Sequence, residues 1–162
     1  MYCVHCDSPL GKLLLTCTDE GLTGIFMDRA LPQPPADHPI LRQTARWLEA
    51  YFRGDNLPAE IPLAPEGTVF QRQVWQCLLS IPCGETRTYG QIAREVARIR
   101  GKENMSAQAV GQAVGSNPIS ILVPCHRVVG ADGQLTGYRG GLEKKIRLLK
   151  LEGHKIEKDI VL

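Results

Sequence analysis

The pattern of hydrophobic and polar residues predicts β-strands at the start of the chain. Residues 1–6, 12–18 and 22–28 are rich in Val, Leu, Ile, Cys and Thr, a composition typical of strands. The stretches Ser8-Pro9-Leu10-Gly11 and Asp19-Glu20-Gly21 separate these runs and have the composition of turns. We therefore expect a small antiparallel sheet here.

A helical period follows the predicted sheet. Leu41, Ala45, Leu48 and Phe52 recur at i, i+4, i+7 and i+11, so they share one face of an amphipathic helix that ends at Gly54. Prolines interrupt the chain before this helix and again after it, at positions 58, 62 and 65. The interruption predicts an N-terminal α/β unit of residues 1–65 and a C-terminal, mainly helical unit of residues 66–162.

Two sequences with the spacing of a capping box mark helix starts in the second unit. Thr68 stands three residues before Gln71, and Thr88 stands three residues before Gln91. The first of these helices ends before Ile81-Pro82-Cys83-Gly84, whose proline and glycine are typical of a helix stop.

Three further features complete the predicted α+β fold. Ser106 is placed to cap a third helix, from Ala107 to about Val114. This helix and the preceding one are joined by a glycine-containing turn in a basic region, an arrangement that resembles a helix-turn-helix. A last helix spans residues 142–149 and stops at Glu152-Gly153.

The third helix consists almost entirely of small residues, from Ala107 to Ala113. Gly111 in its interior costs about 1 kcal/mol relative to alanine and so needs a reason. Small side chains allow a backbone to approach the narrow minor groove of DNA closely. Close packing against a neighbouring helix explains the same pattern, and the residues alone leave both explanations open.

Composition limits the class of protein. The 162 residues are 43% hydrophobic and 22% charged, which is ordinary for a globular chain. No apolar run approaches the roughly 20 residues that a membrane helix requires, and no basic-then-apolar leader opens the chain. We therefore expect a cytoplasmic protein without a membrane partner, whose six cysteines are reduced.

Charge is distributed unevenly along the chain. Residues 1–66 contain 5 Lys/Arg and 9 Asp/Glu, whereas residues 67–162 contain 14 and 8, which together give the net charge of +2. The basic C-terminal part suggests a polyanionic partner. A solvated basic face without any partner has the same composition, so charge alone does not decide between them.

Pro124-Cys125-His126-Arg127-Val128 is the strongest candidate for chemistry. It follows an apolar, β-like run, Ile119 to Val123, and places one thiol beside one imidazole, as a cysteine nucleophile requires. Neighbours in an extended chain point to opposite faces, so His126 reaches Cys125 only across a turn or through a water. Glu152 is a candidate to orient the imidazole. The alternative is a buried structural cysteine.

Taken together, these residues resemble the O6-alkylguanine-DNA alkyltransferases, the methylated-DNA–protein-cysteine methyltransferases. The resemblance covers essentially the whole chain and is densest from Thr68 to Gly153. It rests on Asp7-Ser8-Pro9-Leu10-Gly11, Phe70-Gln71-x-x-Val74-Trp75, Ile81-Pro82-x-Gly84-x-x-x-x-Tyr89, Ala109-Val110-Gly111, Asn117-Pro118, Pro124 to Val129 and Gly137-Tyr138-x-Gly140-Gly141.

The resemblance implies direct repair of alkylated DNA without a cofactor. Cys125 would accept the alkyl group of O6-alkylguanine, and also of O4-alkylthymine, in a single irreversible turnover. His126 would deprotonate Cys125 through a water, and Glu152 would orient His126. Tyr89 would contact the phosphate of the flipped nucleotide and protonate guanine N3, and Asn117 would support the active-site turn.

The resemblance also implies how the substrate is held. A ribonuclease-H-like N-terminal domain would support a winged-helix-like domain that binds duplex DNA as a monomer; clustering of molecules on DNA stays open. The flipped base would be held by the carbonyls of Cys125 and Val128 and by the loop Tyr138-Arg139-Gly140. The expected DNA contacts are Ser106, Ala107, Gln108, Ala109, Gly111, Gln112 and Ser120.

Gln108 is a departure from the family pattern. The family commonly has an arginine here, which enters the base stack in place of the extruded guanine. Glutamine fills space and forms hydrogen bonds but has no positive charge, so we expect Gln108→Arg to tighten DNA binding.

A zinc site in the N-terminal domain, which some relatives have, is not expected. The residues of zinc-like type and spacing are Cys3, His5, Cys6 and Cys17. However, the family's ligand positions fall on Thr18 and Thr23, which are not zinc ligands of this kind. We therefore expect no bound metal.

Three other functions fit part of the pattern. Alkyltransferase-like proteins bind the damage without repairing it but lack the acceptor cysteine. A helix-turn-helix regulator would have no use for Cys125-His126, and a Cys-His hydrolase would turn over repeatedly. One covalent event per molecule distinguishes the alkyltransferase from all three.

Overall fold

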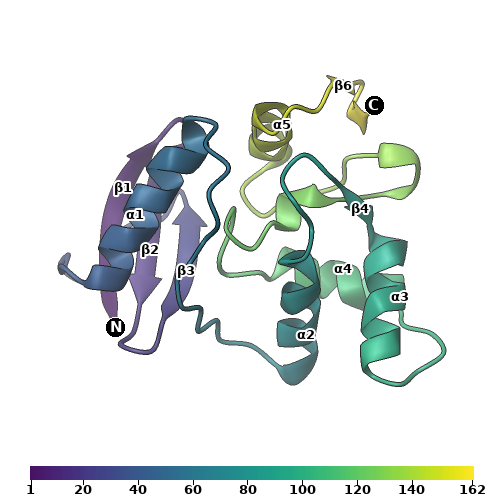
Figure 1. Ribbon diagram of the computed structural model, residues 1–162, viewed down its shortest axis with the longest axis horizontal. Coiled ribbons are helices and arrows are strands. Elements are labelled where there is room, and N and C mark those ends of the chain that lie inside the picture. Colours follow the sequence, from purple (N-terminus) through teal and green to yellow (C-terminus); the bar gives the residue numbers. More distant parts are fainter. The chain divides into compact units, whose positions relative to one another are not determined.

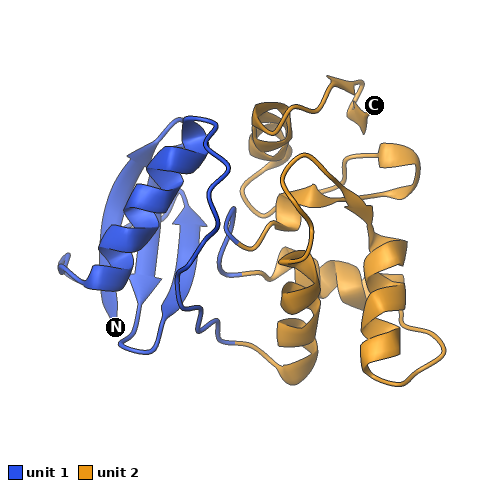
Figure 2. Ribbon diagram, in the orientation of Figure 1, with its two compact units in different colours: residues 1–66, 118–122 blue, residues 67–117, 123–162 orange.

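The computed structural model describes residues 1–162, which form two compact units. One unit comprises residues 1–66 together with 118–122, and the other comprises residues 67–117 together with 123–162 (Figure 2). The segment Pro118–Leu122 thus interrupts the second unit in sequence and completes the first.

The first unit is a three-stranded antiparallel sheet covered on one face by a helix (Figure 1). Its elements are β1 (Tyr2–Ser8), β2 (Gly11–Cys17), β3 (Leu22–Met27) and α1 (Pro39–Phe52), and the strand order is β1-β2-β3. Leu15 of the central strand pairs with Val4 on one side and with Ile25 on the other. Leu15 and Ile25 are fully buried, and Leu48 brings the apolar face of α1 into the same core.

The helix α1 begins slightly before the first residue of its apolar period. Pro39 occupies the first turn, where its missing N–H is no loss, and His38 caps the helix with a ring nitrogen 3.1 Å from the backbone N–H of Ile40. The predicted strands and helix of the N-terminal unit are therefore confirmed, with ends that differ by one or two residues.

The apolar segment before Cys125 is buried but is not the β-like run that the sequence suggested. Only Ile119 forms a bridge, with Ile25, whose N–H also donates to Pro118 O at 2.9 Å. Ile121 adopts a positive φ of 72°, which turns the chain out of an extended path. The segment thus adds apolar side chains to the core of the first unit and then leads into Cys125.

The second unit contains four α-helices, two 3₁₀ turns (Cys125–Arg127 and Ala131–Gly133) and two short sheets. The helices are α2 (Val69–Leu78), α3 (Tyr89–Ile99), α4 (Ala107–Gly115) and α5 (Leu142–Leu151). Strands β4 (Arg87–Thr88) and β5 (Val128–Val129) pair in parallel, and β6 (Ile156–Glu157) and β7 (Ile160–Val161) form a C-terminal hairpin. The predicted α+β fold is therefore confirmed.

Local sequence signals fix where these helices start. Thr68 and Thr88 each accept a hydrogen bond of 3.1 Å from the backbone N–H three residues on, and Gln71 and Gln91 return the bond to the cap. Ser106 caps α4 by accepting from the N–H of Ala109 at 3.2 Å. All three predicted caps are confirmed.

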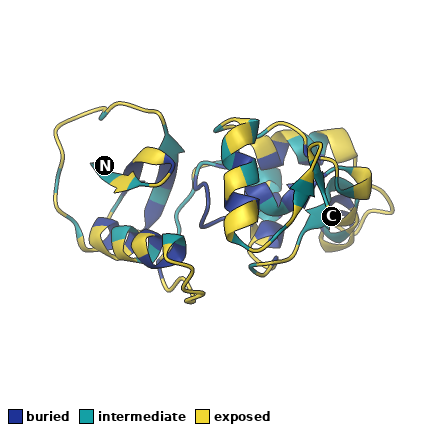
Figure 3. Ribbon diagram, turned by 90° about the horizontal axis from the view of Figure 1, so that it is seen from above, coloured by how far each residue is buried: buried dark blue, intermediate teal, exposed yellow.

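The small-residue helix α4 packs against α2 and α3. The indole N–H of Trp75 donates to Ala113 O at 2.8 Å in the interior, and Val110 of α4, Val74 of α2 and Val96 of α3 are fully buried. Along the helices, exposed and buried residues alternate, so each helix keeps one face toward solvent (Figure 3). None of the helices in the chain is both long enough and apolar enough to cross a membrane.

Candidate active site

Cys125 opens a single 3₁₀ turn, Cys125–Arg127, that leads directly into β5. The turn replaces the extended geometry that would send neighbouring side chains to opposite faces. His126 is fully buried behind it, whereas Cys125 retains 6% exposure. The turn therefore keeps the imidazole inside and leaves Cys125 a small exposed fraction beside the pocket.

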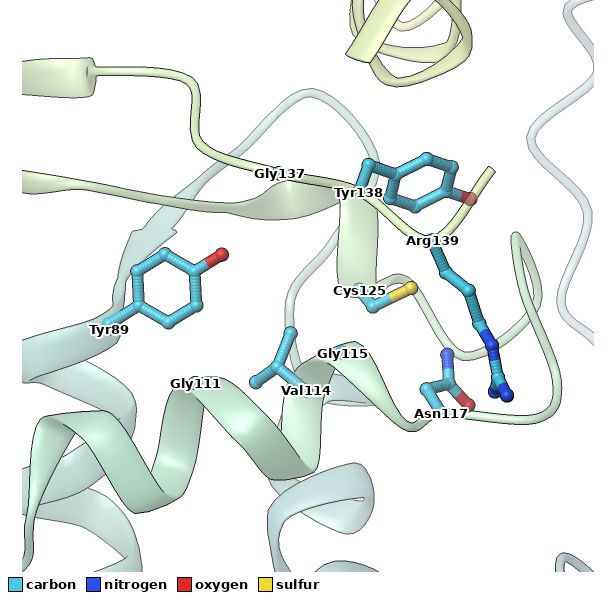
Figure 4. A pocket seen from close by; sticks show the side chains of 9 residues that line it. All are labelled: Tyr89, Gly111, Val114, Gly115, Asn117, Cys125, Gly137, Tyr138 and Arg139. Carbon is cyan, nitrogen blue, oxygen red and sulfur yellow. The ribbon is translucent and has the colours of Figure 1, made fainter. Parts of the chain in front are cut away.

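A small pocket of about 40 Å³ surrounds the sulfur (Figure 4). In the close-up, the Cys125 side chain lies between Tyr138 on one side and Val114 and Asn117 on the other, and Arg139 extends from its loop toward Asn117. The pocket is lined by Tyr89, Gly111, Val114, Gly115, Asn117, Cys125, Gly137, Tyr138 and Arg139. The structure thus brings six of the predicted site residues together around one pocket, from four separate stretches of chain.

Behind the pocket, His126 is joined to a buried carboxylate. Its Nε2 lies 2.7 Å from Oε2 of Glu152, whose two oxygens also accept from Nε (2.8 Å) and Nη2 (3.0 Å) of Arg127. Because the carboxylate held by Arg127 only accepts hydrogen bonds, Nε2 carries the imidazole proton. Nδ1 is then an unprotonated acceptor, and it is buried without a hydrogen-bond partner in the chain.

Burial keeps the Cys125 thiol and the His126 imidazole uncharged in the resting site. It lowers the pKa of His126, an effect that the hydrogen bond to Glu152 opposes. It raises the pKa of the Cys125 thiol, while the Asn117 side chain and the positive charge of Lys145 act in the opposite direction. At neutral pH the site therefore holds a thiol and a neutral imidazole, the pair that proton transfer requires.

Asn117 connects the end of α4 to the cysteine turn. Its Nδ2 donates to Val123 O at 2.9 Å, and the residue is 2% exposed. Together with its hydrogen bond to the Cys125 thiol, this contact holds the chain on both sides of Pro124.

Lys145 and Arg127 were not among the predicted site residues. Lys145 is 1% exposed, and its Nζ donates to Val128 O at 2.7 Å and to Thr136 O at 3.4 Å. Burial lowers its pKa to about 8. A signal was present, because residue 145 falls on the apolar face of α5 defined by Leu142, Ile146 and Leu149.

The predicted DNA contacts on α4 lie at its surface. Ser106, Ala107, Gln108 and Gln112 are exposed, and Ala109 and Gly111 are half-buried. A Cβ added to Gly111 would meet only the Tyr89 ring, at 3.9 Å, which is an ordinary contact. Packing inside the protein therefore does not require glycine at this position.

Ser120 differs from the other predicted DNA contacts. It is 7% exposed, lies in the segment that completes the first unit, and its N–H donates to Ile25 O at 3.3 Å. Ser120 therefore exposes little surface to solvent, because the apolar segment around it is part of a core.

Two of the N-terminal Cys and His side chains contact the backbone of the loops that follow the sheet. The thiol of Cys3 donates to Gln33 O at 3.5 Å, and Nε2 of His5 lies 2.8 Å from Arg29 O. All six cysteines are free, and no three His, Cys, Asp or Glu side chains are grouped as metal ligands would be.

The fold and the site define a class of protein: a two-unit α+β protein whose helical unit carries a cysteine in a pocket that is partly lined by a small-residue helix. Residues 1–65 match the ribonuclease-like domain of 6-O-methylguanine DNA methyltransferase, and residues 69–154 match its DNA-binding domain. The chain belongs to the 6-O-methylguanine DNA methyltransferase family, as the motifs had indicated.

Individual relatives agree along nearly the whole chain. A methylated-DNA–protein-cysteine methyltransferase of Methanosarcina acetivorans is 46% identical over 159 residues, which cover 94% of this chain and 99% of the relative. One from Haemophilus influenzae is 42% identical and covers 94% and 86%. A crystal structure of Mycobacterium tuberculosis OGT in complex with DNA superposes with a TM-score of 0.82 at 42% identity, covering 94% of this chain and 92% of that one. The predicted family, fold class and reaction class, DNA-repair methyl transfer, are confirmed.

Proposed function

We propose that this protein transfers the alkyl group of O6-alkylguanine, and also of O4-alkylthymine, from duplex DNA to Sγ of Cys125. Each molecule acts once. The observation that carries the proposal is the series Cys125, His126 and Glu152, with an unprotonated Nδ1 buried behind a thiol that opens into a pocket.

The first step is removal of the thiol proton. Nδ1 of His126 has no hydrogen-bond partner in the protein. In this proposal a water between Nδ1 and Sγ forms a hydrogen bond with each of them and carries the thiol proton to the imidazole. Glu152 and Arg127 stabilise the positive charge that then develops on His126. Lys145 favours the thiolate from its buried position.

The second step is in-line displacement at the alkyl carbon. A bond forms between Sγ and this carbon as the carbon–O6 bond breaks, and the bonding electron pair passes into the purine. Tyr89 donates its phenol proton to N3, and solvent restores it, while the proton taken by His126 returns to solvent. The sulfur supplies the electron pair, so no cofactor takes part. The thioether is not hydrolysed, and the protein is consumed.

The substrate base has to leave the DNA helix to reach this pocket. The alkyl carbon of a stacked guanine is inaccessible, so the nucleotide rotates out of the duplex. A pocket of about 40 Å³ is smaller than a purine requires, so the loop Tyr138-Arg139-Gly140 moves as the base enters. Cys125 O and Val128 O each accept one hydrogen bond already, which leaves each a second lone pair for the base.

The exposed face of α4 is the proposed DNA contact, through Ser106, Ala107, Gln108, Ala109, Gly111 and Gln112. These short side chains suit the minor groove, and the basic balance of residues 67–162 favours a polyanion. In this proposal residues 1–65 act as the support domain and residues 66–162 bind DNA. The protein works as a cytoplasmic monomer, and clustering on DNA is a separate question.

Damage recognition without repair is the competing function, and Cys125 argues against it. The test is intact-protein mass spectrometry after incubation with an O6-methylguanine duplex. We expect a gain of one methyl group per molecule, located on Cys125 and absent in Cys125→Ser, with Cys77→Ser as the matched control that still gains it. Retained DNA binding without any mass gain would establish recognition alone, and repeated turnover would establish a hydrolase.

A further inference from the structure

We propose that Thr136 is a positioning residue that holds the Tyr89 hydroxyl with its proton directed into the active-site pocket. The inference rests on the proposed proton donation by Tyr89 and extends it to a residue outside the pocket lining. Its basis is a hydrogen bond of 3.1 Å, in which Oγ1 of Thr136 donates to the phenol oxygen of Tyr89.

The direction of this bond decides where the phenol proton points. A phenol oxygen carries one proton and accepts through its lone pairs. When Thr136 occupies an acceptor position, the phenol O–H has to point elsewhere, and the Tyr89 hydroxyl makes no other hydrogen bond within the protein. Because Tyr89 lines the pocket, its free proton is available to a base that enters there (Figure 4).

Thr136 is exposed, but hydrogen bonds hold the backbone at this residue and at the one before it. Lys145 donates to Thr136 O at 3.4 Å, and the N–H of the preceding Leu135 donates to Asp159 O at 2.8 Å. The Leu135 side chain is buried against Val129 and Leu149. The buried lysine and the C-terminal hairpin thus determine where the Thr136 hydroxyl lies relative to α3.

The hydrogen bond from Thr136 has its largest effect on the transfer rate while the Tyr89 proton is being transferred. As the carbon–O6 bond breaks, N3 of the purine takes the phenol proton and negative charge develops on the Tyr89 oxygen. A donor already directed at that oxygen becomes a charge-assisted hydrogen bond and stabilises the transition state more than the ground state. Because the site is open to water, which replaces part of the lost bond, we expect Thr136→Val to slow transfer about tenfold.

The test is a double-mutant cycle in the full chain with an O6-methylguanine duplex. Single-turnover transfer rates at saturating DNA are measured for wild type, Thr136→Val, Tyr89→Phe and the double variant, and dissociation constants are measured in the Cys125→Ser background. We expect Thr136→Val to slow transfer without changing DNA affinity, Thr136→Ser to restore the rate, and the valine substitution to cost nothing further beside Tyr89→Phe.

Each result has a defined meaning. A wild-type rate for Thr136→Val, or an equal slowing in the Tyr89→Phe background, overturns the role of Thr136 and leaves alkyl transfer to Cys125 intact. A wild-type rate for Tyr89→Phe removes the proton donor and the inference with it. Loss of thermal stability in Thr136→Val that Thr136→Ser does not rescue assigns the residue a structural role instead.

Discussion

Oε2 of Glu152 lies 2.7 Å from Nε2 of His126, and the side chains of both residues are at most 1% exposed. The contact joins two residues separated by 26 positions, from the cysteine turn and from the end of α5. Arg127, directly after His126, holds the other side of the same carboxylate. The carboxylate therefore determines which nitrogen of the imidazole can act as a base.

Glu152→Gln tests this arrangement directly. The amide can donate to Nε2 and so favours the tautomer with a proton on Nδ1, which cannot accept the thiol proton. We expect the single-turnover transfer rate to fall by about 10²- to 10⁴-fold, the usual range for a lost acid–base contribution. Quenched-flow measurement gives this rate, and Glu157→Gln, at an exposed residue of β6, is the control. A change of less than about threefold would show that the tautomer does not limit transfer.

The pH dependence of transfer follows from the two shifted pKa values. Burial lowers the pKa of His126 below 6.5, so the imidazole stays neutral and active at pH 6.5 and loses activity only as the pH falls further. Burial raises the pKa of Cys125 above 9.0, so thiolate formed without the base contributes only at alkaline pH. We expect a plateau near neutrality between these limbs. His126→Gln should abolish the plateau and retain the alkaline rise, and a profile identical to that of wild type would contradict His126 as the base.

Local signals in the sequence made the helices predictable, whereas the contacts between distant residues could not be predicted. The boxes at Thr68 and Thr88 operate within three residues, so sequence alone located them. By contrast, an apolar run such as Ile119 to Val123 reports burial and does not distinguish a strand from a buried turn with positive φ at Ile121.

The site shows the same division. Cys125 and His126 are adjacent, so their chemistry was evident. Glu152 could be named as a candidate partner of His126, but the sequence alone could not place it beside the imidazole. Lys145 was not predicted as a site residue. It lies on the apolar face of a helix, where apolar residues are expected. The hydrogen bond of Thr136 with Tyr89 joins two polar residues 47 positions apart and leaves no periodic signal.

Gly111→Ala should separate stability from function. The added Cβ makes only an ordinary contact with Tyr89, and alanine is the better helix former, so the free energy of unfolding should rise by about 0.5–1 kcal/mol. The same methyl group projects into the pocket lining, so transfer should slow. Thermal denaturation and single-turnover rates measure both effects. Gly90→Ala in α3, which also has room for a Cβ, is the control that should not narrow the pocket. Unchanged transfer in Gly111→Ala would leave this glycine without a role in substrate access.

Gln108→Arg should tighten binding to DNA through charge. Gln108 is exposed in the first turn of α4, which contains no acidic residue. One additional phosphate contact makes the slope of log K against log salt more negative by about 0.9, so the gain in affinity should shrink as salt is raised. Fluorescence anisotropy with a labelled duplex at several salt concentrations measures this slope. Asn56→Arg adds the same charge to an exposed loop of the first unit and separates a local contact from the effect of net charge. Equal gains in the two variants would assign the effect to net charge, and unchanged affinity of Gln108→Arg at every salt concentration would show that α4 does not approach DNA at this residue.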